Sequence, residues 1–176
     1  MPSDDDYFGG HGTGVNCAIR AKQHHVSGSH GAAGLVYVFT PKHHGGDTTS
    51  SCWLTDLTFD EEFTIFDRAD GVVVADPKVM DERQVADGNG NLYGYETLPT
   101  GTLRELGTSH QLMAEFPNQL QGADWHGYPI WPIRPYSSEN YQGQKCRPAT
   151  EVFDRMVQLG DISPAQRKRL KKGDWI

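Results

Sequence analysis

The pattern of hydrophobic and polar residues is clearest at the C-terminal end of the chain. Apolar residues recur at helical spacing on one face of residues 150–159, and a glycine follows as a stop; these positions are Val152, Phe153, Met156, Leu159 and Gly160. Ser163 precedes Gln166 by three residues, with Pro164 between them at the first helical position, and this capping box begins a second, basic helix that ends at Gly173. The pattern predicts a two-helix C-terminal cap.

Short apolar runs bounded by turn residues predict strands in the rest of the chain. Residues 35–39 form one such run, closed by Pro41, and residues 62–66 form another. A turn at residues 67–71 leads from the second run into Val72, so these two strands form a predicted hairpin. A short helix is expected over residues 15–23, which have apolar positions at helical spacing.

The second half of the body is rich in turn and aromatic residues. Residues 87–91 read Asp-Gly-Asn-Gly-Asn, a strong turn signal, and an aromatic strand follows from Leu92. Residues 48–57 are either a helix or a loop, and residues 111–116 are either a helix or a strand. Residues 125–133 are dense in aromatics and prolines, which predicts an extended segment that seals the edge of the core.

The composition fits one loop-rich domain. The chain has 176 residues, of which 36% are hydrophobic, with 20 glycines and 10 prolines, so short elements joined by turns are expected. We predict an α+β fold, a single domain with short, mostly antiparallel strands in a split sheet and the two-helix cap. Residues 1–146 form the body, and residues 147–176 form the helical pair packed on it.

Charge is unevenly distributed along the chain. The formal net charge is −7, but residues 161–176 hold five bases and two acids and so carry +3, which leaves −10 for the rest. An acidic body argues against a broad nucleic-acid surface, because such affinity comes from Lys and Arg neutralising phosphates. Nucleic acid is therefore expected as a partner only through the basic tail, Arg167–Lys172, for which a solvated helix face is the commoner explanation.

No membrane span is expected, because no run of about 18 apolar residues occurs. The N-terminus, Met-Pro-Ser-Asp-Asp-Asp, is acidic where a secretory signal is basic and then apolar. We therefore expect a cytoplasmic protein, or one delivered as an effector without a classical signal peptide. The three cysteines, at positions 17, 52 and 146, form no CxxC pair, so buried free thiols are the default, and one disulfide stays open as an alternative.

The histidines do not have the spacing of a metal site. Six of the eight lie before residue 45, but no H-E-x-x-H or H-x-x-x-H pattern places two of them on one helical face. No bound metal is expected, and a histidine-dependent nuclease toxin ranks third among the functions considered. The turn at Asp87 does not fit a calcium loop, because Leu92 and Leu98 stand where an EF-hand has glycine and glutamate.

Two motifs near the N-terminus suggest a nucleotide site. Residues 9–14 read Gly-Gly-His-Gly-Thr-Gly, and residues 34–41 read Gly-Leu-Val-Tyr-Val-Phe-Thr-Pro. An HGT motif followed by a helix, a Ser/Gly loop and a G-x-V-Y-V strand resembles the amino-terminal half of His-Tyr-acid ADP-ribosyltransferases, which include small bacterial toxin domains. The resemblance covers residues 8–41.

The resemblance implies NAD as the substrate and assigns roles to individual residues. His11, Gly12 and Thr13 would hold the adenosine ribose and the nicotinamide amide, and Tyr37 would stack on the cationic nicotinamide ring. Cleavage of the nicotinamide–ribose bond passes through an oxocarbenium-like state that a carboxylate stabilises. Glu96 is the candidate for that catalytic acid, because it follows Tyr37 in a strand-like aromatic run, and the alternatives are Asp67 and Glu105.

The resemblance therefore predicts transfer of ADP-ribose from NAD to a macromolecular acceptor by a toxin-like or effector-like domain. The partners implied are a protein acceptor or a cognate immunity protein, with no membrane. The alternative is a non-enzymatic partner-binding protein, immunity-like or adaptor-like, that uses its acidic surface and the segment from Trp125 to Trp131.

Overall fold

The computed structural model describes residues 24–26, 35–38, 43–44, 51–71, 83–119, 123–130, 148–174 and 176. The predicted helix over residues 15–23, the motif His11–Thr13 and the strand expected from Val72 lie outside these residues. So do Cys17, Cys146 and Trp131. Cys52 is a buried free thiol, as expected.

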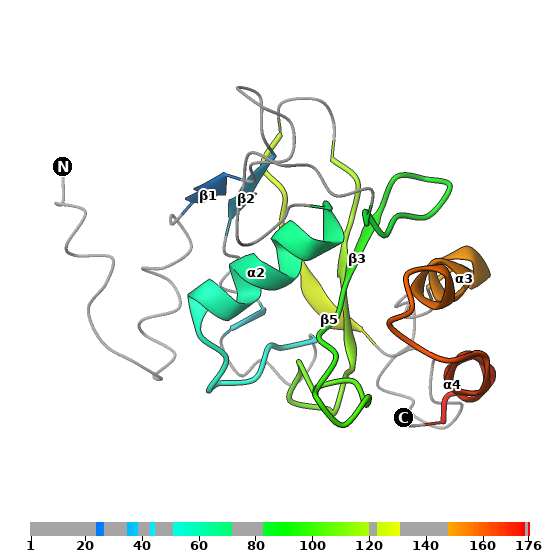
Figure 1. Ribbon diagram of the computed structural model, residues 1–176. Coiled ribbons are helices and arrows are strands. Elements are labelled where there is room, and N and C mark those ends of the chain that lie inside the picture. Colours follow the sequence, from blue (N-terminus) through cyan, green and yellow to red (C-terminus); the bar gives the residue numbers. More distant parts are fainter. Residues whose placement is uncertain are drawn as a thin grey trace, which may run out of the picture.

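A three-stranded antiparallel sheet is the centre of the fold (Figure 1). Its order is β3 (Leu92–Gly94), β4 (Met113–Phe116) and β5 (Tyr128–Ile130), so residues 111–116 resolve as a strand. Side chains alternate between its faces: Leu92, Ala114 and Phe116 enter one hydrophobic cluster, and Tyr93, Met113 and Ile130 enter a second. The sheet therefore separates two cores.

Helix α2 (Phe59–Ala69) covers the first face of this sheet, and it corrects the strand predicted for residues 62–66. The strand was predicted because the apolar residues Phe63, Ile65 and Phe66 lie close together in the sequence, and the helix start signal at Thr58 was missed. The Thr58 side chain accepts from the backbone N–H of Glu61, whose carboxylate accepts from the Thr58 N–H, which is a capping box. No hairpin joins residues 62–66 to Val72, because the first partner is helical.

The C-terminal cap covers the opposite face (Figure 1). It consists of α3 (Thr150–Gln158) and α4 (Pro164–Leu170), with the predicted capping box at Ser163. Val152, Phe153 and Met156 of α3 are at most 1% exposed in the second cluster. The predicted α+β fold with short antiparallel strands and a helical cap is confirmed.

A second, two-stranded sheet pairs β1 (His24–Val26) with β2 (Val36–Val38) in antiparallel register. The strand expected at residues 35–39 is confirmed, whereas β1 was not predicted. Trp125 attaches β2 to the body: its N–H donates to the Val36 carbonyl at 2.7 Å, and its carbonyl accepts from Val38 at 2.8 Å. Trp125 is 8% exposed within the first cluster, so the core-sealing role predicted for its segment holds at this residue.

The turn predicted at residues 87–91 is present and leads into β3. The Asp87 carboxylate accepts from the backbone N–H groups of Asn89 and Asn91, at 2.8 and 3.0 Å, and from the Tyr93 hydroxyl at 3.0 Å. Burial raises the pKa of Asp87, but these bonds together hold it below its ordinary value. The Asp87 carboxylate therefore stabilises this turn.

Candidate functional site

Helix α2 carries polar side chains on two faces, and each face forms a distinct group. The inner face holds a buried glutamate against β2, and the outer face lines an open cleft. We call the first group the inner network, Tyr37, Glu62 and His44. The second group is the outer cleft, lined by Asp60, Glu61, Thr64, Ile65, Arg68 and Glu96.

The inner network is built around a carboxylate inside the core. Glu62 is 1% exposed; one of its oxygens accepts a hydrogen bond from the Tyr37 hydroxyl, and the other lies 3.1 Å from Nε2 of His44. A carboxylate removed from water requires such partners, since an uncompensated buried charge is costly. The network therefore joins β2, α2 and the segment containing His44.

Aromatic rings enclose Tyr37. Its ring centroid lies 4.8 Å from that of Phe66, 5.6 Å from that of Phe116 and 5.8 Å from that of Phe63, and its side chain is 1% exposed. Burial, and next the charge of Glu62, raise the pKa of the Tyr37 hydroxyl well above its ordinary value. Tyr37 is thus a neutral hydrogen-bond donor at physiological pH.

His44 is the member of the inner network that could act as an acid or a base. The imidazole stacks on Trp53, with centroids 6.5 Å apart and planes at 19°, and Phe59 meets it edge-on at 6.3 Å. Nε2 of His44 faces the Glu62 carboxylate without hydrogen-bond geometry, so their contact is an ion pair only when the imidazole is protonated. The His44 side chain is 13% exposed, however, so any substrate would have very limited access to it.

The outer cleft lies between α2 and the start of a tight loop after β3. It encloses about 160 Å³, and its lining includes Ile65, whose side chain is 1% exposed. Two backbone hydrogen bonds fold the loop back on itself. The Leu98 N–H donates to the Thr102 carbonyl at 2.8 Å, and the Arg104 N–H donates to the Glu96 carbonyl at 2.9 Å. This return places Arg104 next to Glu96 at the cleft.

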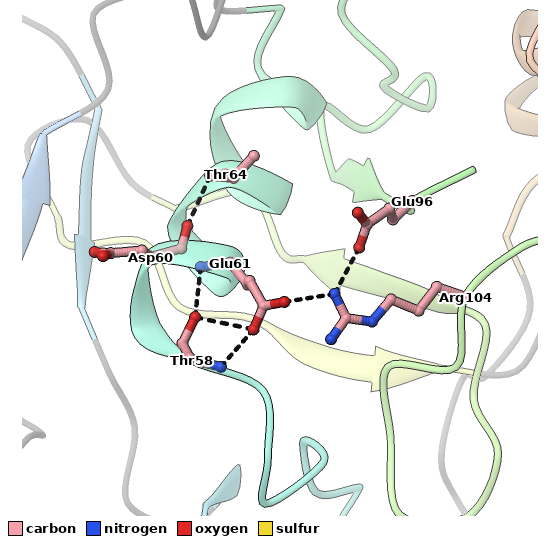
Figure 2. Close-up of polar contacts among 6 residues, drawn as sticks. All are labelled: Thr58, Asp60, Glu61, Thr64, Glu96 and Arg104. Carbon is pink, nitrogen blue, oxygen red and sulfur yellow. Dashed lines mark hydrogen bonds and ion pairs between the residues drawn. The ribbon is translucent and has the colours of Figure 1, made fainter. Parts of the chain in front are cut away.

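Arg104 connects the two walls of the cleft (Figure 2). One of its terminal nitrogens donates to Glu61 at 2.7 Å and to Glu96 at 2.9 Å. The bond from Thr58 N–H chiefly lowers the pKa of Glu61, with Arg104 contributing, and the bond to Glu61 chiefly raises that of Arg104. The Asp60 carboxylate points away from this bridge and has no hydrogen-bond or ion-pair partner among the described residues.

The structure separates the site residues that the sequence suggested. His11, Gly12 and Thr13 lie outside the described residues. Tyr37 belongs to the inner network, whereas Glu96 lines the outer cleft, to which Tyr37 does not contribute.

The Tyr37 hydroxyl bonds Glu62, which was not among the acids suggested by the sequence. Asp67 is a half-buried residue of α2, and Glu105 is exposed and 3.1 Å from His110. Sequence reasoning missed Glu62 and His44. The capping box at Thr58 would have identified the helix and, through its periodicity, the inward position of Glu62.

Within the described ranges, no group of three or more His, Cys, Asp or Glu side chains is arranged to hold a metal ion. The helices in the described part of the chain also include none long and apolar enough to cross a membrane. No protein-family model, curated protein or solved structure matches this chain.

Proposed function

We propose that this chain is a partner-binding protein that takes a basic segment of its partner at the outer cleft. The observation that carries the proposal is the form of the cleft: three acidic residues, Asp60, Glu61 and Glu96, line an open hollow together with Ile65. Lys and Arg side chains combine an apolar stem with a charged head, so they match such a surface. The volume of about 160 Å³ suits one or two side chains rather than a whole nucleotide.

The surrounding charge supports the same ligand. Residues 51–71 contain six acids and one base, a net charge of −5. Glu62 and Asp70 are buried, but Asp56 and Asp60 are exposed. Arg68 and Arg104 offset part of this charge at the cleft, whereas the Asp60 carboxylate, which points away from the Arg104 bridge, has no partner among the described residues.

A labelled short arginine peptide, with a glutamate peptide of equal length as the control, tests the proposal by fluorescence anisotropy. Binding of the arginine peptide should weaken with salt. Each exposed ion pair contributes about 0.2–1 kcal/mol, so Asp60→Asn with Glu96→Gln should weaken binding about two- to thirty-fold.

Asp174→Asn is the matched control, because Asp174 is an exposed acid that follows α4 and does not line the cleft. It changes the net charge as Asp60→Asn does and should leave the affinity unchanged. Equal losses in Asp60→Asn and Asp174→Asn would show that binding follows overall charge, and the proposal for the cleft would fail.

We propose ADP-ribosyl transfer as a second candidate, and one observation favours it. The inner network brings a histidine, a tyrosine and a glutamate into contact, the residue types that the resemblance requires, although with His44 and Glu62. Release of nicotinamide from NAD, with His44→Ala and Glu62→Gln as variants, tests it. Turnover that falls in both variants supports the transferase, and no release of nicotinamide by the intact chain refutes it.

A further inference from the structure

Four basic side chains of the cap lack a partner among the described residues. Within that part of the chain, Lys168, Arg169, Lys171 and Lys172 take part in no ion pair or side-chain hydrogen bond, unlike Arg167, which bonds Asp154. Three of the four are exposed, and the inward position of the helix is taken by Leu170 at 0% exposure. We call these four residues the basic strip.

The fold keeps the basic strip away from the acids that would neutralise it. The strip lies on α4 and the turn after it, on one side of the three-stranded sheet, and the acidic helix α2 lies on the other side (Figure 1). The sheet and both cores stand between them. A contact between these two charged surfaces therefore requires two molecules.

We propose that the basic strip docks on the outer cleft of a second copy of this chain. This inference rests on the proposed function and names the partner of the same site. It follows from charge complementarity: residues 161–176 carry +3, and the residues that line the cleft include three acids and one base. Lysine and arginine side chains from a short helix supply the stem and head that the cleft fits.

The geometry also fixes the type of assembly. A contact between opposite faces of the same molecule is head-to-tail, and such contacts extend into chains or close into rings instead of forming a two-fold dimer. Each copy keeps one free cleft and one free strip until a ring closes. The average mass should therefore rise with protein concentration beyond that of a dimer.

Sedimentation velocity on the full chain tests this inference. At low ionic strength the intact protein should show concentration-dependent association, and in 1 M salt, where the Debye length is about 3 Å, it should be monomeric. Lys168→Gln with Lys172→Gln removes two of the four positive charges of the strip, and Asp60→Asn with Glu96→Gln weakens the cleft. Each variant alone should associate about two- to thirty-fold more weakly than the intact chain, so the measurements use a concentration at which each variant alone is monomeric.

Mixing the two variants gives the decisive result. One variant keeps its cleft and the other keeps its strip, so an equimolar mixture should form a dimer and nothing larger. Arg68→Gln is the opposite-sign control, because it removes an exposed cation from the cleft and should strengthen association. Folding of every variant is checked by circular dichroism.

Three results would overturn the inference. The first is an intact chain that is monomeric at every concentration, the second is association unchanged in either variant, and the third is a mixture that forms no dimer. If the arginine peptide binds while the chain stays monomeric, the cleft binds basic ligands but its partner is another protein. The two proposals thus fail separately.

Discussion

Replacement of Tyr37 by phenylalanine tests the account of the inner network. The change removes one oxygen and leaves the ring among Phe63, Phe66 and Phe116, so it creates almost no cavity. What is lost is the bond from the hydroxyl to the Glu62 carboxylate, which is 1% exposed. A hydrogen bond to a charged group contributes about 1.5–3 kcal/mol, so Tyr37→Phe should lower the free energy of unfolding by that amount.

Urea denaturation of four proteins provides the measurement: the intact chain, Tyr37→Phe, Glu62→Leu and the double variant. Glu62→Leu leaves the Tyr37 hydroxyl buried without its acceptor, whereas the double variant removes both groups. The sum of the two single losses should therefore exceed the loss in the double variant by about 1–3 kcal/mol. Additive losses, or a Tyr37→Phe loss below about 0.5 kcal/mol, would refute the reasoning.

Three other predictions follow from the helix start, the sheet and the tyrosines. Thr58→Ala removes the cap that bonds Glu61 and should cost about 1 kcal/mol in chemical denaturation, with no loss if the helix begins elsewhere. Gly94→Ala would place a methyl group 2.4 Å from Cγ2 of Ile65 and should destabilise the protein by about 1–3 kcal/mol, whereas unchanged stability would contradict the packing of α2 on β3. The raised pKa of Tyr37 keeps its proton on in the folded state while unfolded tyrosine ionises, so stability should fall as pH rises above about 10, by up to about 1.4 kcal/mol per pH unit. The slope should be shallower in Tyr37→Phe, and an equal slope would show that other groups cause the fall.

The sequence predicted those elements whose boundaries are set by residues close to one another in the chain. The cap is the clearest case, because the box at Ser163 and the glycine stop at Gly160 act within one helical turn. The turn at Asp87 is another, since its carboxylate bonds residues two and four positions ahead. Such signals do not depend on the rest of the fold.

The candidate site could not be predicted from the sequence, because it depends on contacts between residues far apart in the chain. Glu62 follows Glu61 directly, yet one is buried and the other lines the surface cleft, a difference that appears only after residues 59–69 are recognised as a helix. The burial of Tyr37 arises from Phe66 and Phe116, which are 29 and 79 positions away (66 − 37 and 116 − 37). The sequence of β2 shows an aromatic residue between two valines but does not show which partners cover it.

Pro129 restricts how this protein can meet other chains. It lies in the middle of β5, which pairs only with β4 among the described strands, and it has no amide hydrogen to offer an added strand. A peptide that paired with the free edge of β5 would find no backbone N–H donor at Pro129. This disfavours both the binding of a ligand as an added strand and edge-to-edge aggregation at β5. Recognition at this edge is therefore left to side chains, whose interactions depend on salt and can be changed by single substitutions.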